Sequence, residues 1–215
     1  MTLILVTTTR TRIKICGITR PEDAIAAISR GVDALGLVFY QSSPRAVSIK
    51  EAREIASHTP VFVSKVGLFV DAEAASVTDV IKQVPLDYLQ FHGNEDEAYC
   101  AAFELPYIKA IAVRPDLNLI EALAAYKSAA AFLLDAWHPD LAGGTGEVFD
   151  WSLLKGLQNN GQALILAGGL NAGNVKTAIK LLKPYAVDVS TGVEEAPGIK
   201  SVTKIEQFVN EVNGV

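Results

Sequence analysis

The sequence predicts an α/β protein, specifically a (β/α)8 (TIM) barrel, and three observations support this prediction. Short apolar runs rich in Val, Ile, Leu and Ala alternate with longer segments of helical character, and eight of each can be counted. A chain of 215 residues gives about 27 residues to each unit, close to a strand, a helix and two short loops. Strands that are apolar throughout and followed by helices are typical of a parallel sheet covered on both faces.

Each predicted strand is a short run of β-branched or other apolar residues that stops at a polar residue or a glycine. The strands in chain order are RIKIC (12–16), ALGLVF (34–39), VSKVGLFV (63–70), DYLQF (87–91), YIKAIAV (107–113), AFLLDA (131–136), ALILAG (163–168) and AVDVS (186–190). In such barrels the active site lies at the C-terminal ends of the strands and in the loops that follow them. Polar residues at those positions are therefore the candidates for function.

Helices are predicted between the strands and after the last one. Residues 48–58 are one example, because apolar residues recur there at helical spacing, and residues 171–182 and 201–212 are two more. An open doubly wound sheet is the alternative architecture, but the first strand and turn lack the GxGxxG fingerprint of that fold. No linker divides the chain, so a single domain over residues 1–215 is expected, with residues 1–10 as an N-terminal extension of no assigned role.

Composition excludes several classes of function. The net charge of −5 and the pI near 5.2 provide no global positive field for nucleic acid or an anionic membrane. Two cysteines do not make a disulfide framework and favour a reducing cytoplasm. We find neither a signal peptide nor an apolar stretch of about 18 residues, the length of a membrane span. The expected protein is cytoplasmic, with monomer as the default.

Cys16 ends the first predicted strand and directly precedes Gly17. Most free cysteines are small buried hydrophobes, and this interpretation competes with a functional one. The coming helix N-terminus would place backbone N–H groups near Cys16, where they favour a thiolate. Cys100, by contrast, lies in the middle of a predicted helix and is expected in the core. Arg45, in the loop after the second strand, is either a solvated surface residue or a fork for a carboxylate or phosphate.

The fourth and sixth strands end in polar side chains. Alternation places Gln90 and His92 on one face of their strand and Leu89 and Phe91 on the other, so the polar pair faces the barrel interior. Asp135 follows three apolar residues, where a carboxylate must be hydrogen-bonded, paired or chemically useful. After it, Gly143, Gly144 and Gly146 have the composition of a loop that closes over a ligand, or of a plain mobile loop.

The loops after the seventh and eighth strands predict a phosphate site. Barrels of this kind bind phosphate with these two loops and a short extra helix. Glycines allow backbone N–H groups to approach a ligand closely, and hydroxyls add further donors. The candidate residues are Gly168, Gly169, Ser190, Thr191 and Gly192.

Taken in order, several motifs resemble the phosphoribosylanthranilate isomerase family of tryptophan biosynthesis. They are KICGIT, VGLFV, LQFHGNE, LLDA with GGTG and FDW, AGGL with NV, and DVSTGVE with PGIK, and they span nearly the whole chain. The cysteine of KICGIT followed by the aspartate of LLDA is the most specific combination. Phe91 and Thr191 depart from the usual leucine and serine, and neither departure touches these two residues.

The resemblance implies an Amadori rearrangement of N-(5-phosphoribosyl)anthranilate to 1-(2-carboxyphenylamino)-1-deoxyribulose 5-phosphate. By the same resemblance Asp135 is the general acid, which needs a raised pKa, and Cys16 is the general base, which needs a lowered one. Arg45 would hold the anthranilate carboxylate, and Gln90, His92 and Asp188 would line the pocket. No metal or organic cofactor is implied, because proton transfers alone complete the isomerisation.

Two rival hypotheses stay open at this point. One is a metal-dependent epimerase of ribulose phosphates with Asp135, His138 and His92 as ligands, although the second and third strands do not complete such a cage. The other is a non-catalytic sensor of phosphorylated sugars, which would be expected to have lost Cys16 or Asp135. Whether the related sugar isomerisation of histidine biosynthesis is also accepted is left open by the sequence.

Overall fold

A computed structural model describes residues 10–114, 116–136, 151–154 and 162–215 of the chain. Its eight strands β1–β8 form a closed barrel in which each strand pairs in parallel with the next and β8 pairs with β1. The strands are β1 Arg12–Cys16, β2 Ala34–Val38, β3 Ser64–Phe69, β4 Tyr88–Phe91, β5 Tyr107–Val113, β6 Ala131–Ala136, β7 Ala163–Leu166 and β8 Ala186–Val189. The predicted barrel is therefore confirmed.

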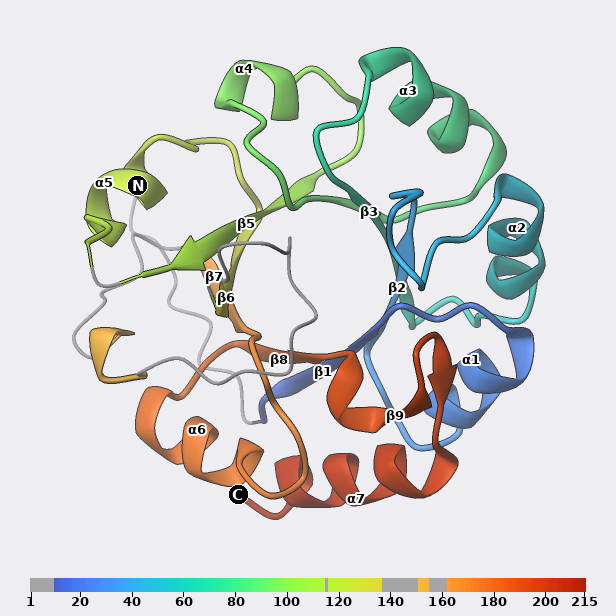
Figure 1. The fold of residues 1–215 in the computed structure, drawn as a ribbon, viewed down its shortest axis with the longest axis vertical. Coiled ribbons are helices and arrows are strands. Elements are labelled where there is room, and N and C mark those ends of the chain that lie inside the picture. Colours follow the sequence, from blue (N-terminus) through green and yellow to red (C-terminus); the bar gives the residue numbers. More distant parts are fainter. Residues whose placement is uncertain (1–9, 115, 137–150, 155–161) are drawn as a thin grey trace.

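Helices surround the barrel, and Figure 1 shows them as an outer ring around the strands. They are α1 Pro21–Ile28, α2 Ile49–Ser57, α3 Ala74–Gln83, α4 Glu97–Cys100, α5 Leu119–Ala124, α6 Val175–Leu182 and α7 Val202–Asn213, with short 3-10 turns η1 Trp151–Leu154 and η2 Thr191–Val193. Between η2 and α7 the chain forms a small antiparallel hairpin of β9, Glu194–Ala196, and β10, Ile199–Lys200. This hairpin lies on the same side of the barrel as β1 and α1 (Figure 1).

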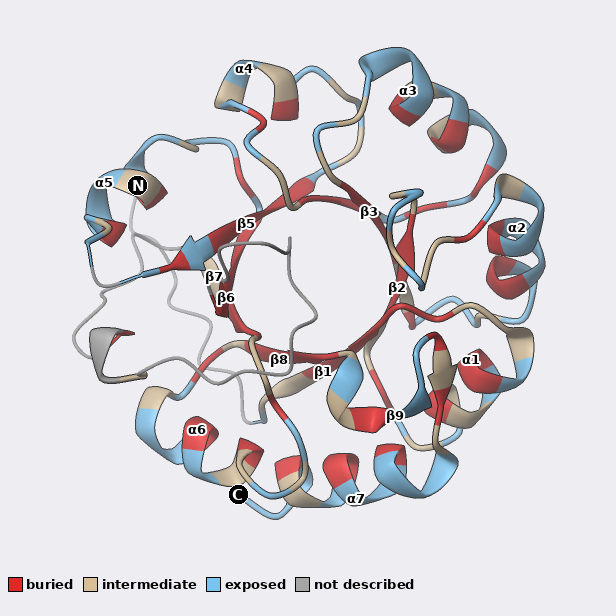
Figure 2. Ribbon diagram, viewed as in Figure 1, coloured by how far each residue is buried: buried red, intermediate tan, exposed pale blue. Residues whose placement is uncertain are grey.

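The strand alternation divides the apolar residues between two regions. The larger cluster fills the space between strands and helices, so each helix is buried on the side that faces the barrel and exposed on the other (Figure 2). A second cluster, which includes Val66, Ile108, Leu133 and Ile165, comes from the strands alone and fills the barrel interior. The barrel interior is therefore packed with apolar side chains along much of its depth.

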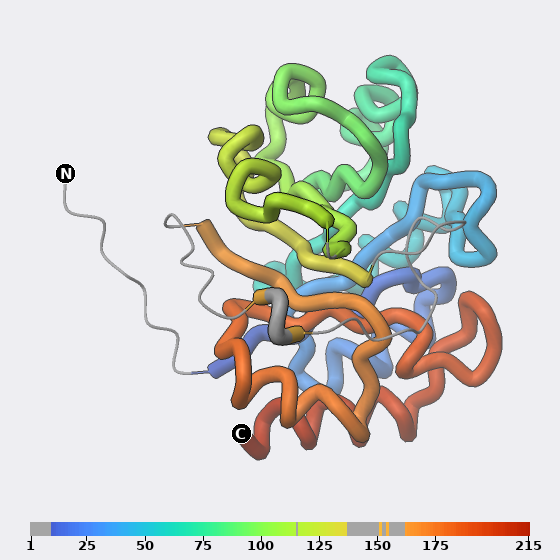
Figure 3. The backbone as a smooth tube through the Cα atoms, turned by 60° about the vertical axis from the view of Figure 1, so that its left-hand side comes forward, coloured from blue at the N-terminus to red at the C-terminus, as the bar shows by residue number. Residues whose placement is uncertain are grey.

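The last two helices, α6 and α7, lie side by side, as the orange and red segments of Figure 3 show. Both predicted helices of this region form, although α6 begins at Val175, four residues later than predicted. Asn171 and Asn174 explain the delay. The Asn174 side chain accepts the backbone N–H of Asn171, and the Asn171 side chain accepts that of Gly173. These local bonds stabilise a turn in place of the first helical turn.

Candidate active site

Cys16 lies at the C-terminal end of β1 with its side chain inside the barrel. It is 7% exposed and belongs to a small apolar cluster with Val38, the last residue of β2, and Leu68, near the end of β3. The backbone of Gly36 on β2 passes so close that an added Cβ would lie 2.7 Å from the Cys16 sulfur. A glycine at this position therefore makes room for the thiol. Cys100, as predicted, is buried in the core, where burial raises its pKa to about 12.

A buried ion pair lies beneath the thiol. Lys14 and Asp188 are direct partners in the β1–β8 register, and their charged groups are 2.9 Å apart. Asp188, predicted to line the sugar end of the pocket, is thus inside the barrel with its carboxylate already paired. Burial alone would lower the pKa of Lys14, but Asp188 and Cys16 outweigh this effect and raise it.

The pKa of Cys16 is raised, whereas the proposed role of a general base led us to expect a lowered one. Burial in the barrel raises it above its ordinary value, and Asp188 adds to the rise. Lys14 and Lys200 act in the opposite direction, since each cation favours the thiolate. Backbone dipoles were expected to lower the pKa of this thiol. Instead, two lysines supply the opposing field, and burial still dominates.

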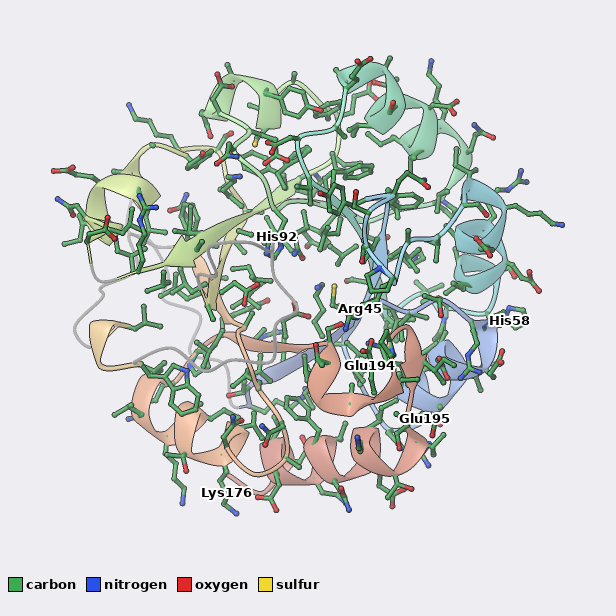
Figure 4. All side chains as sticks on the ribbon, in the orientation of Figure 1. Arg45, His58, His92, Lys176, Glu194 and Glu195 are labelled. Carbon is green, nitrogen blue, oxygen red and sulfur yellow. The ribbon has the colours of Figure 1, made fainter. Side chains whose placement is uncertain are left out.

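Asp135 is the end of a hydrogen-bonded row of three side chains. Gln90 is completely buried, and its Nε2 lies 2.9 Å from Nδ1 of His92. The other ring nitrogen of His92, Nε2, lies 3.1 Å from Oδ2 of Asp135. The backbone N–H of Ala136 donates to Oδ1 of Asp135 at 2.8 Å. The predicted inward face of β4 is confirmed, and Figure 4 shows His92 pointing into the barrel opening.

Arg45 makes a carboxylate contact within the protein. Its Nε and Nη2 donate to the two oxygens of Glu194 at 2.8 Å each, and Nη2 also reaches the Thr191 hydroxyl at 3.3 Å. Lys200 donates to Glu194 at 2.8 Å and to the carbonyl of Ser190 at 3.2 Å. Arg45 and Glu194 lie together in Figure 4. Glu194 thus occupies one edge of the Arg45 guanidinium, and the binding of a substrate carboxylate by Arg45 stays a prediction.

The three charges of this cluster do not cancel. Burial would raise the pKa of Glu194, but Arg45 and Lys200 outweigh it and hold the pKa below its ordinary value. Burial lowers the pKa of Lys200, although the contact with Glu194 opposes this. With Arg45 charged, two cations surround one carboxylate. This side of the opening carries an excess positive charge, which favours an anionic ligand.

The glycine-rich loops after β7 and β8 lie against each other and against the end of β6. Gly168 and Gly169 both have positive φ, +82° and +63°, a backbone that other residues adopt only with strain. An added Cβ at Gly168 would lie 3.2 Å from Oδ1 of Asp135. At Gly192 it would overlap the carbonyl of Leu170. The predicted phosphate loops are thus brought together, next to the carboxyl of Asp135.

Sequence reasoning missed three charged residues of this region. Lys14 was detectable, because alternation places it on the same face of β1 as Cys16. Glu194 and Lys200 carried no such signal, since they belong to a short hairpin whose pairing is not visible in the pattern. The glycines at 143, 144 and 146 and the histidine at 138 lie outside the described residues. Within the described ranges, no group of three or more His, Cys, Asp or Glu is placed to hold a metal.

A closed parallel barrel with a thiol, a carboxyl and paired glycine loops at the C-terminal ends of its strands defines an enzyme of the (β/α)8 class. Residues 13–211 match the family described as "PRAI: N-(5'phosphoribosyl)anthranilate (PRA) isomerase". The chain belongs to this family, and it is an isomerase.

Related proteins align with this chain along almost its whole length. The N-(5'-phosphoribosyl)anthranilate isomerase of Cellvibrio japonicus is 52% identical over 197 residues, which is 92% of this chain and 91% of that protein. The enzyme of Pseudomonas putida strain F1 is 52% identical over 201 residues, 94% of this chain and 97% of that protein. The crystal structure of the Thermotoga maritima enzyme superposes with a TM-score of 0.88 at 40% identity and covers 95% of this chain and 100% of that one.

A further solved structure of a phosphoribosyl anthranilate isomerase contains a ligand. It is described as a complex with reduced 1-(o-carboxyphenylamino)-1-deoxyribulose 5-phosphate. Its TM-score is 0.85 at 39% identity, with 95% of this chain and 100% of that one covered. That relative therefore binds a phosphorylated ligand that also carries an aromatic carboxylate.

Proposed function

We propose that this isomerase converts N-(5'-phosphoribosyl)anthranilate to 1-(o-carboxyphenylamino)-1-deoxyribulose 5-phosphate, with Asp135 as general acid and Cys16 as general base. The observation that carries the proposal is the placement of one carboxyl and one thiol at the ends of β6 and β1, around the same packed barrel interior. Both groups are mostly buried, at 8% and 7% exposed. Two proton-transferring groups that meet one substrate are what an aldose–ketose rearrangement requires.

The chemistry divides into two proton transfers. Asp135 gives its proton to the ring oxygen of the ribose, the bond from that oxygen to C1 breaks, and the nitrogen lone pair forms a C1=N iminium. The Cys16 thiolate then takes the proton from C2, and the electron pair moves toward the iminium to give the enol amine. A proton moves to C1 as the C2 hydroxyl loses its own, which gives the ketone. Passing the proton from the thiol back to Asp135 restores the resting enzyme.

Binding groups surround these two residues. Gly168 and Gly169 support the phosphate through their left-handed backbone, and the Ser190–Gly192 segment adds hydroxyl and N–H donors. Arg45 binds the anthranilate carboxylate. Since Glu194 occupies its Nε and Nη2 edge, the substrate carboxylate either takes the remaining edge of the guanidinium or replaces Glu194 there.

We further propose a monomer that works in the cytoplasm on a phosphorylated small molecule. Both cysteines are buried and unpaired, which fits a reducing compartment. Among the described residues, no helix is long and apolar enough to cross a membrane. Sedimentation should give a mass near 23.0 kDa, and a mass of twice that value would refute the monomer.

The test is turnover of phosphoribosylanthranilate, generated in the assay, by the wild type, Cys16→Ala and Asp135→Asn without added metal. We expect rapid conversion by the wild type and a loss of about 10²–10⁴-fold in kcat for each variant, the usual contribution of a general acid or base. Cys100→Ala is the matched control for loss of a buried thiol and should keep its kcat. A folded wild type that binds sugar phosphate without converting it would refute the isomerase and support the sensor.

A further inference from the structure

The side-chain amide of Gln90 contacts the imidazole ring of His92. A neutral imidazole carries its hydrogen on one of its two nitrogens. The amide nitrogen of Gln90 lies 2.9 Å from Nδ1 of His92. In this orientation of the amide the nitrogen donates, so Nδ1 accepts with its lone pair and the neutral imidazole carries its hydrogen on Nε2. That Nε2–H faces Oδ2 of Asp135 at 3.1 Å. The orientation of one amide therefore sets the direction of both hydrogen bonds in the row.

The direction of these two hydrogen bonds determines where a proton on Asp135 can point. With the hydrogen on Nε2, both oxygens of Asp135 accept bonds from the protein, one from His92 and one from the backbone of Ala136. A proton held by Asp135 then points away from His92. With the opposite tautomer, the bare Nε2 would accept that proton, and the acid would donate to the protein in place of the substrate.

Packing alone does not explain why a glutamine occupies position 90. The side chain is completely buried inside the barrel, and its Oε1 has no hydrogen-bond partner among the described residues. Methionine would fill a similar volume without an unpaired carbonyl, and leaving a buried acceptor unpaired costs free energy. Rotating the amide would pair the oxygen with Nδ1 only if Nδ1 carried a hydrogen. The hydrogen bond to His92 is therefore the contribution of the Gln90 amide that a methionine could not make.

We propose that Gln90 is a positioning residue that holds His92 in the neutral Nε2–H tautomer, so that the proton of Asp135 is reserved for the substrate. This inference rests on the proposed role of Asp135 as the general acid. Gln90 acts through His92, which stands between it and the carboxyl.

The direct test is nitrogen NMR of the full-length enzyme labelled with ¹⁵N-histidine, since the two tautomers give distinct ring-nitrogen shifts. The chain has only three histidines, and the spectrum of His92→Gln identifies the His92 signals. We expect the Nε2–H pattern for the wild type at the pH of the assay. A wild-type His92 that carries its hydrogen on Nδ1, or on both nitrogens, would overturn the proposal, and this measurement needs no active variant.

Gln90→Met and Gln90→Glu test the consequence for turnover. Gln90→Met removes the donor, so we expect a mixture of tautomers and a kcat lower by about tenfold with little change in KM. Gln90→Glu replaces the donor with an acceptor, so Nδ1 gains a hydrogen and kcat falls further. Leu89→Met, an equally buried change on the opposite face of β4, controls for repacking and should leave kcat and tautomer unchanged.

A Gln90→Met variant that keeps both the Nε2–H pattern and the wild-type kcat would overturn the proposal. Thermal unfolding shows whether each variant is folded. If a variant does not fold, the NMR spectrum of wild-type His92 still tests the proposal. Failure of the proposed function is distinguishable, because the wild type would then show no turnover, and failure of the acid role alone would show as turnover retained by Asp135→Asn, whatever the tautomer of His92.

Discussion

The thiol of Cys16 is placed for proton abstraction, yet its surroundings in the free enzyme favour the protonated form. Burial raises its pKa above the ordinary value of 9.0, while Lys14 and Lys200 lower it. Since only the thiolate is a base, the free enzyme holds a small active fraction at neutral pH. The two lysines limit this loss.

This balance predicts how the ionisation of Cys16 depends on pH, which the rate of alkylation by iodoacetamide reports in a Cys100→Ala background. Below the pKa of Cys16 the thiolate fraction grows about tenfold for each pH unit, so the alkylation rate should rise from neutral pH to beyond pH 9. Lys14→Gln removes a cation that favours the thiolate and should move the rise to higher pH. Lys176→Gln, at the exposed pair with Glu211, is the control. A profile that Lys14→Gln leaves in place would contradict the role of Lys14.

At the scale of elements, one buried ion pair connects β5 to the loops that follow β3 and β4. The ammonium of Lys109, on β5, contacts Glu95 at 2.9 Å and the carbonyl of Gly93 at 2.7 Å. Glu95 in turn accepts the backbone N–H groups of Asp71 at 2.8 Å and of Gly93 at 3.0 Å. The loops after β3 and β4 are thereby held to β5, and Gln90 and His92 lie in the segment that leads into this cluster.

Lys109→Met should therefore destabilise the protein strongly. It leaves the charge of Glu95 buried without its cation, which typically costs about 3–5 kcal/mol of unfolding free energy. The same change at Lys176, whose pair with Glu211 is exposed, should cost about 1 kcal/mol or less. Urea unfolding measures both values. Equal losses at the two sites would show that the buried pair contributes no more than a surface pair.

At the scale of the whole molecule, the Arg45–Glu194–Lys200 cluster joins the first quarter of the chain to the last. Arg45 and Glu194 are 149 positions apart in sequence. Arg45 and Lys200 hold the pKa of Glu194 below its ordinary value of 4.5. The corresponding stabilisation is complete above that value and is lost as the pH falls through the lowered pKa.

Acid should consequently weaken this connection below about pH 4.5. Glu194→Gln should lower the unfolding free energy at pH 7 by about 3 kcal/mol, because it leaves the buried Lys200 and the partly buried Arg45 without their carboxylate. The loss should be smaller at pH 3, where the wild type has lost part of the same interaction. Unfolding curves at the two pH values give the comparison, and an identical loss at both would contradict it.

The strands were predictable because parallel barrel strands are apolar runs, and β1, β5 and β6 have the predicted bounds. Alternation also placed Gln90 and His92 on the inner face of β4. The carboxylate that Arg45 contacts was not predictable. Glu194 reaches Arg45 only through the β9–β10 hairpin and the closure of the barrel, and no local pattern encodes a contact between such distant segments. The pKa of Cys16 likewise depends on burial and on lysines from two separate elements.

The circular order of the strands also means that neither half of the chain holds a complete site. Cys16 lies on β1 and Asp135 on β6, so a break in the exposed segment after α4 would separate base from acid. His92 would stay with the first fragment, and the residues of the β7 and β8 loops with the second. Each fragment alone should be inactive. Co-expression of the two should restore isomerisation only when they reassociate into a closed ring, so fragment complementation would report barrel assembly directly in cells.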